Sequence, residues 1–405
     1  MKDYSRASLA LHEKLRGKIG IELKAELNTK EDMTLCYSPG VAEPCLQIAN
    51  DPEKAWDLTI KGNTVAIVTD GTAVLGLGDI GPTAALPVME GKAMLFKRFG
   101  GVDAFPICLD TQDTEEIVRT VKLLSPTFGG INLEDISAPR CFEIEDKLQD
   151  MGIPVFHDDQ HGTAIVTLAG LINACKLLNK DIKDLRVVVN GAGAAGIAIS
   201  NLLNGKDQDP DVFTPVKEII ICDSKGIIHK DRRDLNDFKR YLLTFSNPNN
   251  IKGTVKDAIV DADVFIGVSV EDVLNKHDIE KMAKDPIIFA LANPNPEITP
   301  QEAYDGGAGV IGTGRSDLPN QVNNVLAFPG IFKGALRAKA SRITPRMKLA
   351  AAYAIASEVG DISRDNIIPS SFNMAVADQV ADAVEKAWKE EIEIIKLMES
   401  VNDPL

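Results

Sequence analysis

Two acidic pairs, Glu134-Asp135 and Asp158-Asp159, stand ahead of a glycine-rich segment at residues 191–196. Each pair follows an apolar run that is typical of a β-strand, at residues 130–133 and 153–156. Carboxylates at the ends of parallel strands converge at the edge of an open α/β sheet, where ligands bind. Several oxygen ligands in one place suit Mg²⁺ or Mn²⁺ better than zinc. Alone, each pair could be a solvated turn; together with the glycine-rich segment they favour a metal site beside a nucleotide site.

The glycine-rich segment has the pattern of a dinucleotide-binding turn, and its residues are Gly191, Ala192, Gly193, Ala194, Ala195 and Gly196. A valine-rich strand at 185–190 precedes it and a small-residue helical pattern follows, which is the context that this motif requires. The glycines permit close approach of a pyrophosphate to the N-terminus of the helix. The alternative is a tightly packed turn without a ligand, but the flanking elements favour the dinucleotide.

The next strand, at 218–222, leads to Asp223. A carboxylate there would accept hydrogen bonds from the adenosine ribose, which favours NAD. Lys225 could instead meet a 2′-phosphate, so NADP stays open. Two later strands end near Ser269 and Asn293, which are candidate cofactor contacts. Each could equally cap a helix or a turn, and for Ser269 we favour the cap.

Composition restricts the classes of partner. The 405 residues carry a net charge of −15, which disfavours nucleic acid and anionic membranes as partners. Six scattered cysteines form no CxxC motif and indicate reduced thiols. The first residues are too charged for a signal peptide, and no apolar run reaches the roughly 20 residues of a membrane span. We therefore expect a cytoplasmic protein.

Alternating strand and helix patterns predict an α/β protein with mostly parallel sheets. We expect an N-terminal α/β catalytic domain over residues 1–160. A Rossmann-type, doubly wound NAD(P)-binding domain should follow over 161–405, ending in helices that could pack back on the first domain. A long helix is expected at 5–27, and an apolar helix at 162–178 should link the domains.

Several ordered motifs resemble those of the malic enzymes. They are Tyr37-Ser-Pro-Gly-Val-Ala42, the run from Thr69 to Asp79, Glu90-Gly-Lys92, Leu133-Glu-Asp135, the run from His157 to Thr163, and Asn323-Asn-Val. They span roughly residues 35–330 and are similar to the short bacterial and archaeal form. The resemblance implies oxidative decarboxylation of (S)-malate to pyruvate and CO₂ with NAD or NADP and a divalent metal.

The resemblance also implies roles for individual residues. The metal ligands would be Glu134, Asp135 and Asp159, which nearly neutralise a 2+ ion and leave positions for substrate. Lys92 would take the C2 hydroxyl proton, which requires its pKa to fall from about 10.4. Tyr37 would protonate C3, and Asp158 would hold Lys92, although the two aspartates could exchange roles.

Other positions complete the expected site. Asn293 and Asn324 would lie near malate and the nicotinamide ribose, with Asn323 as an alternative to Asn324. His157 and His161 would be structural or supporting residues rather than zinc ligands. Ala73 stands where animal malic enzymes carry an arginine that binds a malate carboxylate. The Ser38–Gly40 region, Thr72 or an unidentified basic residue would have to replace it.

Three alternatives use parts of the same pattern. A dedicated oxaloacetate decarboxylase would need only the metal, Lys92 and Tyr37. A catalytically silent NAD-binding sensor would leave the carboxylates and Lys92 without a role. An amino-acid dehydrogenase would likewise give the carboxylates no role. We expect malate, oxaloacetate and pyruvate as small-molecule partners. We also expect a homodimer, with Tyr37 close to, or supplied across, the subunit interface.

Overall fold

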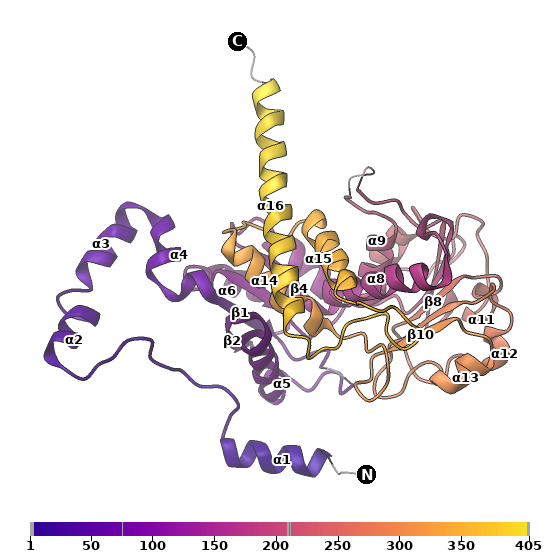
Figure 1. Ribbon diagram of the computed structural model, residues 1–405, viewed down its shortest axis with the longest axis horizontal. Coiled ribbons are helices and arrows are strands. Elements are labelled where there is room, and N and C mark those ends of the chain that lie inside the picture. The colour runs from indigo at the N-terminus through magenta and orange to yellow at the C-terminus, as the bar shows by residue number, and fades with distance from the viewer. Residues whose placement is uncertain (1–3, 75, 209, 211, 403–405) are drawn as a thin grey trace.

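The computed structural model describes residues 4–402 apart from residues 75, 209 and 211, and its strands form two separate sheets (Figure 1). The first sheet has the order β2-β1-β3-β4 and is parallel throughout. The second has the order β10-β9-β8-β5-β6-β7, and only β7 runs antiparallel. The predicted α/β class with mostly parallel sheets is therefore confirmed.

The first sheet brings the two acidic pairs together. Its strands are β1 (Thr64–Thr69), β2 (Asp103–Cys108), β3 (Gly130–Leu133) and β4 (Val155–His157). Strands β3 and β4 are neighbours, with Leu133 opposite His157. Because both run in the same direction, the residues that follow them leave the sheet side by side. Helices α5 (Pro82–Leu95), α6 (Thr114–Leu124) and α7 (Arg140–Leu148) connect these strands.

The second sheet has the doubly wound order expected of a Rossmann domain. Its strands are β5 (Arg186–Asn190), β6 (Glu218–Asp223), β7 (Gly226–Ile227), β8 (Val264–Gly267), β9 (Ile287–Ala290) and β10 (Val310–Thr313). Its helices are α9 (Ala194–Leu203), α10 (Asp237–Leu242), α11 (Val255–Ala258), α12 (Lys276–Ile279) and α13 (Pro300–Asp305). The winding reverses between β5 and β8, so a crevice forms where those two strands end.

Helix α8 (Asp158–Leu178) connects the two sheets and begins at the second acidic pair, four residues earlier than predicted. Contrary to the sequence expectation, it is long and apolar enough to span a membrane, with a mean hydropathy of 1.3. However, 72% of that apolar window is buried inside the protein. It packs against α9 and α15, so it is the central helix of the folded chain.

The C-terminal helices α14 (Phe328–Arg337), α15 (Pro345–Ser357) and α16 (Ala375–Asn402) pack on one another. Helix α14 also contacts the π-helical turn Phe96–Gly100 that continues α5, where the Phe96 and Phe328 rings lie 4.6 Å apart. Helices α14 and α16 therefore both contact the turn that follows α5. In Figure 1, the last turns of α16 extend beyond the rest of the chain.

The N-terminal arm, residues 4–50, extends away from the two sheets apart from its contact with α5 at Lys18 (Figure 1). It contains α1 (Tyr4–Leu15), α2 (Lys30–Cys36) and α3 (Ala42–Asn50), and none of the three has a buried residue. The predicted helix over 5–27 is wrong beyond Leu15, because Gly17 adopts a φ of 112° and breaks it. The arm leads into β1 through one short helix and two 3₁₀ turns, which are α4 (Ala55–Leu58), Pro52–Lys54 and Ile60–Asn63.

Candidate active site

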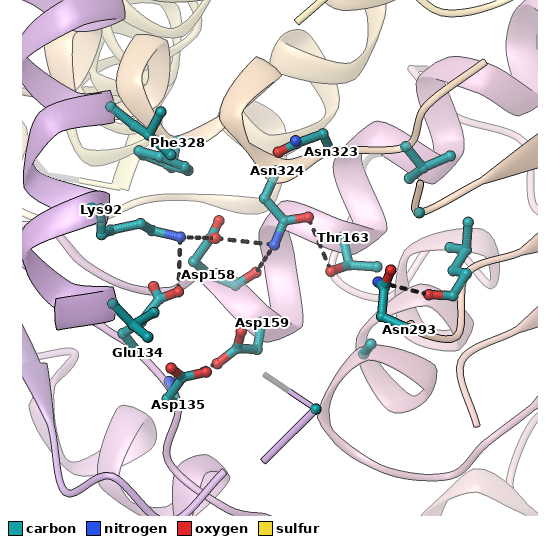
Figure 2. Close-up of a pocket in the computed structure, with 18 of the residues that line it drawn as sticks. Lys92, Glu134, Asp135, Asp158, Asp159, Thr163, Asn293, Asn323, Asn324 and Phe328 are labelled. Atoms are coloured by element: carbon teal, nitrogen blue, oxygen red, sulfur yellow. Dashed lines mark hydrogen bonds and ion pairs between the residues drawn. The ribbon is translucent and has the colours of Figure 1, made fainter. Parts of the chain in front are cut away.

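One large pocket, of about 950 Å³, lies where the two sheets present their strand ends. Its lining includes both acidic pairs and Lys92 from the first sheet's side, and Ser269 and Asn293 from the second. Figure 2 shows the two acidic pairs, Lys92 and Asn293 around this pocket. The pocket thus joins the predicted metal residues to two of the predicted cofactor residues, Ala195 and Asn293.

Three of the four carboxylates form a compact cluster. Glu134, Asp135 and Asp159 each offer an oxygen, and these oxygens all lie within 4.8 Å of one another. The backbone N–H of Asp135 donates to Asp159 at 2.9 Å, and Asn132 donates to Glu134 at 2.9 Å. These bonds hold the Glu134 and Asp159 side chains in place within the cluster.

The cluster carries more negative charge than its surroundings balance. Burial raises the pKa of Asp135 to about 8, and the nearby charge of Asp159 adds to that effect. Burial likewise raises the pKa of Glu134 well above its usual range, although Lys92 opposes the shift. The buried Oδ2 of Asp135 has no hydrogen-bond partner. A divalent cation would satisfy this oxygen and remove the repulsion.

Lys92 lies at the centre of the site, in the last turn of α5. Its Nζ donates to Glu134 at 2.8 Å, pairs closely with Asp158, and lies 4.1 Å from the centre of the Phe328 ring. Burial acts to lower the pKa of Lys92, but the charges of Asp158 and Glu134 outweigh it and raise the pKa. The expected fall in pKa is therefore wrong for this arrangement, because two carboxylates stabilise the ammonium.

The fourth carboxylate, Asp158, stands apart from the cluster and faces Lys92 (Figure 2). Asn324 donates to its Oδ2 at 3.0 Å and accepts a hydrogen bond from Thr163 at 3.1 Å. Gly162, one turn further along α8, makes this approach possible: a Cβ there would lie 2.0 Å from Asp158 Oδ1. Asn324 makes these contacts, whereas the Asn323 side chain caps a 3₁₀ turn by accepting from Val325 N.

The glycine-rich turn has the geometry that a close ligand requires. Gly191 has a φ of 122°, and a Cβ at Gly196 would lie 1.7 Å from the Gly191 carbonyl oxygen. A Cβ at Gly193 would meet open space, directly before the first turn of α9. The first and last glycines are therefore needed for packing, while the middle one leaves room at the helix N-terminus.

Asp223 is already surrounded by donors. Its Oδ1 accepts from Arg232 at 2.7 Å and from the Lys225 backbone at 2.9 Å, and its Oδ2 accepts from Arg232 at 3.0 Å and Lys239 at 2.7 Å. Burial acts to raise the pKa of Asp223, but these donors outweigh it and lower the pKa to about 2. A carboxylate offers roughly four acceptor positions, so a ribose would have to compete for one. The Lys225 side chain pairs with Asp234 instead.

Ser269 and Asn293 both line the pocket. The favoured reading of Ser269 as a helix cap is wrong, because the next helix, α12, begins at Lys276 and Asn275 is its cap. The Ser269 hydroxyl accepts from Asn190 at 2.7 Å and is held at the mouth of the dinucleotide crevice. Asn293 precedes a cis peptide bond to Pro294, and its side chain reaches the pocket beside Gly314.

The two histidines near the second acidic pair stand outside the carboxylate cluster. His161 shares Glu145 with the Gln160 side chain and is 2.8 Å from one Glu145 oxygen. Lys348 lies 3.1 Å from the same ring. Burial acts to raise the pKa of Glu145, but the charge of His161 outweighs it and the pKa falls to about 2. His157 is fully buried and lies 3.8 Å from Asp159. This buried network supports α8 from behind.

Several predicted site residues are not among those that line the pocket: Tyr37, Asp223 and, within the glycine-rich turn, every residue except Ala195. Tyr37 is 72% exposed on the N-terminal arm and is not among the residues that line the pocket. Ala73 hydrogen-bonds to the backbone of Asp135 and is likewise absent from the lining. Lys18, which was predicted to lie inside a helix, does line the pocket. Arg232, Lys239 and Phe328 were also missed, since no motif marks them.

Comparison with known proteins agrees with this geometry. Residues 16–149 match the malic enzyme N-terminal domain, and residues 160–388 match the malic enzyme NAD binding domain. The bifunctional malic/malolactic enzyme of Bacillus subtilis is 59% identical, over 95% of this chain and 92% of its own length. The NAD-dependent malic enzyme of Geobacillus stearothermophilus is 56% identical, over 92% of this chain and 76% of its own.

A solved structure extends the likeness to three dimensions. The NAD-dependent malic enzyme of Thermotoga maritima superimposes with a TM-score of 0.88 at 49% identity. The match covers 93% of this chain and 98% of that one. The resemblance seen in the motifs thus extends over both sheets, and the chain belongs to the malic enzyme family.

Proposed function

We propose that the protein catalyses oxidative decarboxylation of (S)-malate to pyruvate and CO₂, with NAD as the favoured acceptor and a divalent cation as a requirement. The observation that carries this proposal is one pocket that holds a carboxylate cluster and a buried lysine–aspartate pair and that reaches the glycine-rich turn at Ala195. The activities named for the relatives from B. subtilis and G. stearothermophilus support it.

Glu134, Asp135 and Asp159 would hold the cation. Their hard oxygen donors suit Mg²⁺ or Mn²⁺, and the unpartnered Asp135 oxygen fits a missing positive charge. When bound, the cation supplies Lewis-acid polarisation of the oxygen on C2, and the nicotinamide supplies the hydride acceptor. Glu134 also bonds Lys92, so sharing its charge with a cation would weaken one of the two forces that keep Lys92 protonated.

Lys92 and Asp158 would manage the first proton. As the hydride leaves C2 of malate, the C2 hydroxyl loses its proton to the Lys92 amine, which must be neutral at that moment. Asp158, which accepts a hydrogen bond from the Lys92 Nζ, is placed to take the proton that Lys92 first gives up. Asn324 and Gly162 fix Asp158, and Phe328 covers the other side of the amine and excludes water. Holding these groups in register is itself a large part of such catalysis.

The second half of the reaction needs an acid near C3. The C3–C4 bond breaks, CO₂ leaves with no net charge, and the electron pair left on C3 must take up a proton. We infer that Tyr37 donates it. Since Tyr37 lies far out on the arm, we infer further that it acts in the pocket of a second copy of this chain, within a homodimer.

The exposed apolar side chains of the arm support such a dimer. Leu35 is 67% and Leu46 59% exposed, on either side of Tyr37. Soluble chains rarely leave so many large apolar groups uncovered in one region. A mixture of Tyr37→Phe and Lys92→Ala proteins tests the exchange, because each pure variant lacks one group. Half of the mixed molecules would be heterodimers with one complete site, so about a quarter of the wild-type activity should return; no recovery would refute the exchange.

An initial-rate assay tests the main proposal. Malate is supplied with NAD or with NADP, with and without Mn²⁺, and the formation of reduced nicotinamide is followed. We expect turnover with malate and NAD that is abolished by chelation of the metal. No turnover under any of these conditions would refute the proposal.

Oxaloacetate decarboxylation is the second candidate. The carboxylate cluster and Lys92 are complete without the dinucleotide, so the site should also decarboxylate oxaloacetate. Rapid loss of oxaloacetate, together with no oxidation of malate, would identify a dedicated decarboxylase instead.

A further inference from the structure

A malate-binding pocket must hold a dianion, and the arginine that animal malic enzymes use is absent at Ala73. The nearby candidates are already engaged. The Thr72 hydroxyl donates to Asp70 at 2.6 Å and accepts from the Ser137 backbone at 3.0 Å. Arg140 pairs with Asp70 at 2.8 Å and donates to the Gln112 carbonyl at 2.7 Å. Neither Thr72 nor Arg140 is among the residues that line the pocket.

Lys18 reaches the pocket from the other side of α5. Its backbone N–H donates to Glu90 at 2.9 Å, and its Nζ donates to the Pro87 carbonyl at 2.6 Å. Two of its three N–H donors therefore stay available. The segment is seated on α5, because Gly17, with its positive φ, brings the chain against the Glu90 side chain.

The motif Glu90-Gly-Lys92 thereby gains a role for each member. Glu90 anchors the Lys18 backbone and Lys92 is the buried amine. Gly91 leaves room between them: a Cβ there would lie 3.6 Å from Lys18 Nζ. A larger side chain at 91 would occupy the space in which the Lys18 ammonium lies. The glycine thus allows a second cation to lie beside the residue that precedes Lys92.

Charge gives this second cation a purpose. Four carboxylates line the pocket, and Lys92 is committed to two of them. In the part of the chain that the structure describes, Lys18 has no carboxylate within ion-pair distance of Nζ. Its charge is thus not neutralised by the protein, unlike that of Lys92.

We propose that Lys18 binds the C4 carboxylate of malate and selects dicarboxylates over monocarboxylic 2-hydroxy acids. The proposal rests on the proposed malate oxidation, in which C1 and the C2 oxygen face the carboxylate cluster. Because C4 leaves as neutral CO₂, the attraction acts in the ground state and fades in the transition state. Loss of Lys18 should therefore raise KM without lowering kcat.

The test compares two ligands on two proteins. (S)-Lactate has the carboxylate and hydroxyl of malate but lacks the C4 carboxylate. Lys18→Met should weaken the binding of malate about 10- to 100-fold, as expected for the loss of a hydrogen bond to a charged group. The KM for malate measures this loss during turnover, and calorimetry measures it on the Mn²⁺-loaded protein without nucleotide. The inhibition constant and calorimetric affinity of (S)-lactate should stay within about threefold of wild type. Lys18→Arg should restore most of the malate affinity, and Lys14→Met, on the exposed face of α1, is the matched control.

If Lys18→Met weakened the binding of malate and lactate equally, or weakened neither, the proposal would be overturned. Binding is measured without turnover, so a wild-type protein that failed to oxidise malate would refute the proposed function while the calorimetric comparison still decided the role of Lys18. A thermal melt of each variant separates loss of a contact from loss of the fold.

Discussion

Replacing Gly162 with alanine tests whether the position of Asp158 controls catalysis. A Cβ at residue 162 would lie 2.0 Å from Asp158 Oδ1 and 3.1 Å from the Asn324 side-chain carbon Cγ. Since unstrained contacts of this kind begin at about 3.4 Å, the Asp158 carboxylate must move by more than about 1 Å. Misplacement of a catalytic group by that distance can cost about 100-fold in rate.

Stability should change far less than activity. Alanine is favoured over glycine inside a helix by about 1 kcal/mol, which offsets part of the local strain in α8. We therefore expect Gly162→Ala to fold, to bind Mn²⁺ through Glu134, Asp135 and Asp159 much as the wild type does, and to lose about 100-fold in kcat. Malate-dependent formation of reduced nicotinamide measures kcat, and calorimetry measures the metal affinity.

Gly170→Ala in the same helix is the matched control. Its Cβ would meet the flexible end of Ile368 at 2.9 Å, far along α8 from the acidic pair. It shares the helix-propensity change but leaves Asp158 alone, so its kcat should stay near that of the wild type. A Gly162→Ala enzyme with kcat within about threefold of wild type would refute the link between this glycine and the Lys92–Asp158 pair.

Three further predictions concern single carboxylates. Asp159→Asn should weaken Mn²⁺ binding more than tenfold, whereas Asp158→Asn should lower kcat and largely spare the metal; calorimetry and initial rates separate the two, and identical effects would contradict the division of roles. In the metal-free protein, Asp135 holds a proton in the folded state up to about pH 8 but releases it near pH 4 when unfolded. As pH rises through that window, this difference in proton binding lowers the melting temperature of the protein. Bound Mn²⁺ or the substitution Asp135→Asn should reduce this fall, which thermal melts at pH 5 and pH 8 would detect. Asp223→Ser should release Arg232 and Lys239 to bind a 2′-phosphate, and should shift the ratio of kcat/KM values at least tenfold towards NADP. An unchanged ratio of kcat/KM for NAD and NADP would show that these cations do not face the ribose.

Local patterns were sufficient to predict most of the strands and the two acidic pairs that line the pocket. The strands before Glu134 and Asp158, and the glycine-rich turn at 191–196, follow from apolar runs with polar or glycine ends. Their convergence required the knowledge that β3 and β4 are neighbours, which no residue pattern near them reveals. The malic enzyme resemblance supplied the roles that spacing alone left open.

The missed residues share a physical cause. Lys18 follows a helix-forming sequence, and only the positive φ of Gly17 turns it towards α5. Arg232 and Lys239 lie in a loop and a short helix, and they meet Asp223 only through the folding of β6 and β7. Contacts between distant segments of this kind leave no periodic pattern in the sequence.

Helix α8 limits how this chain can be divided. The predicted boundary near residue 160 falls within its first turn, where Asp158 and Asp159 are held by helical backbone that continues to Leu178. A fragment that begins at residue 161 would lack both aspartates, and a fragment that ends at residue 160 would carry them on a frayed end. Chimeras that exchange cofactor domains between relatives should therefore be joined after Leu178, so that the chemistry of one parent travels with the whole helix.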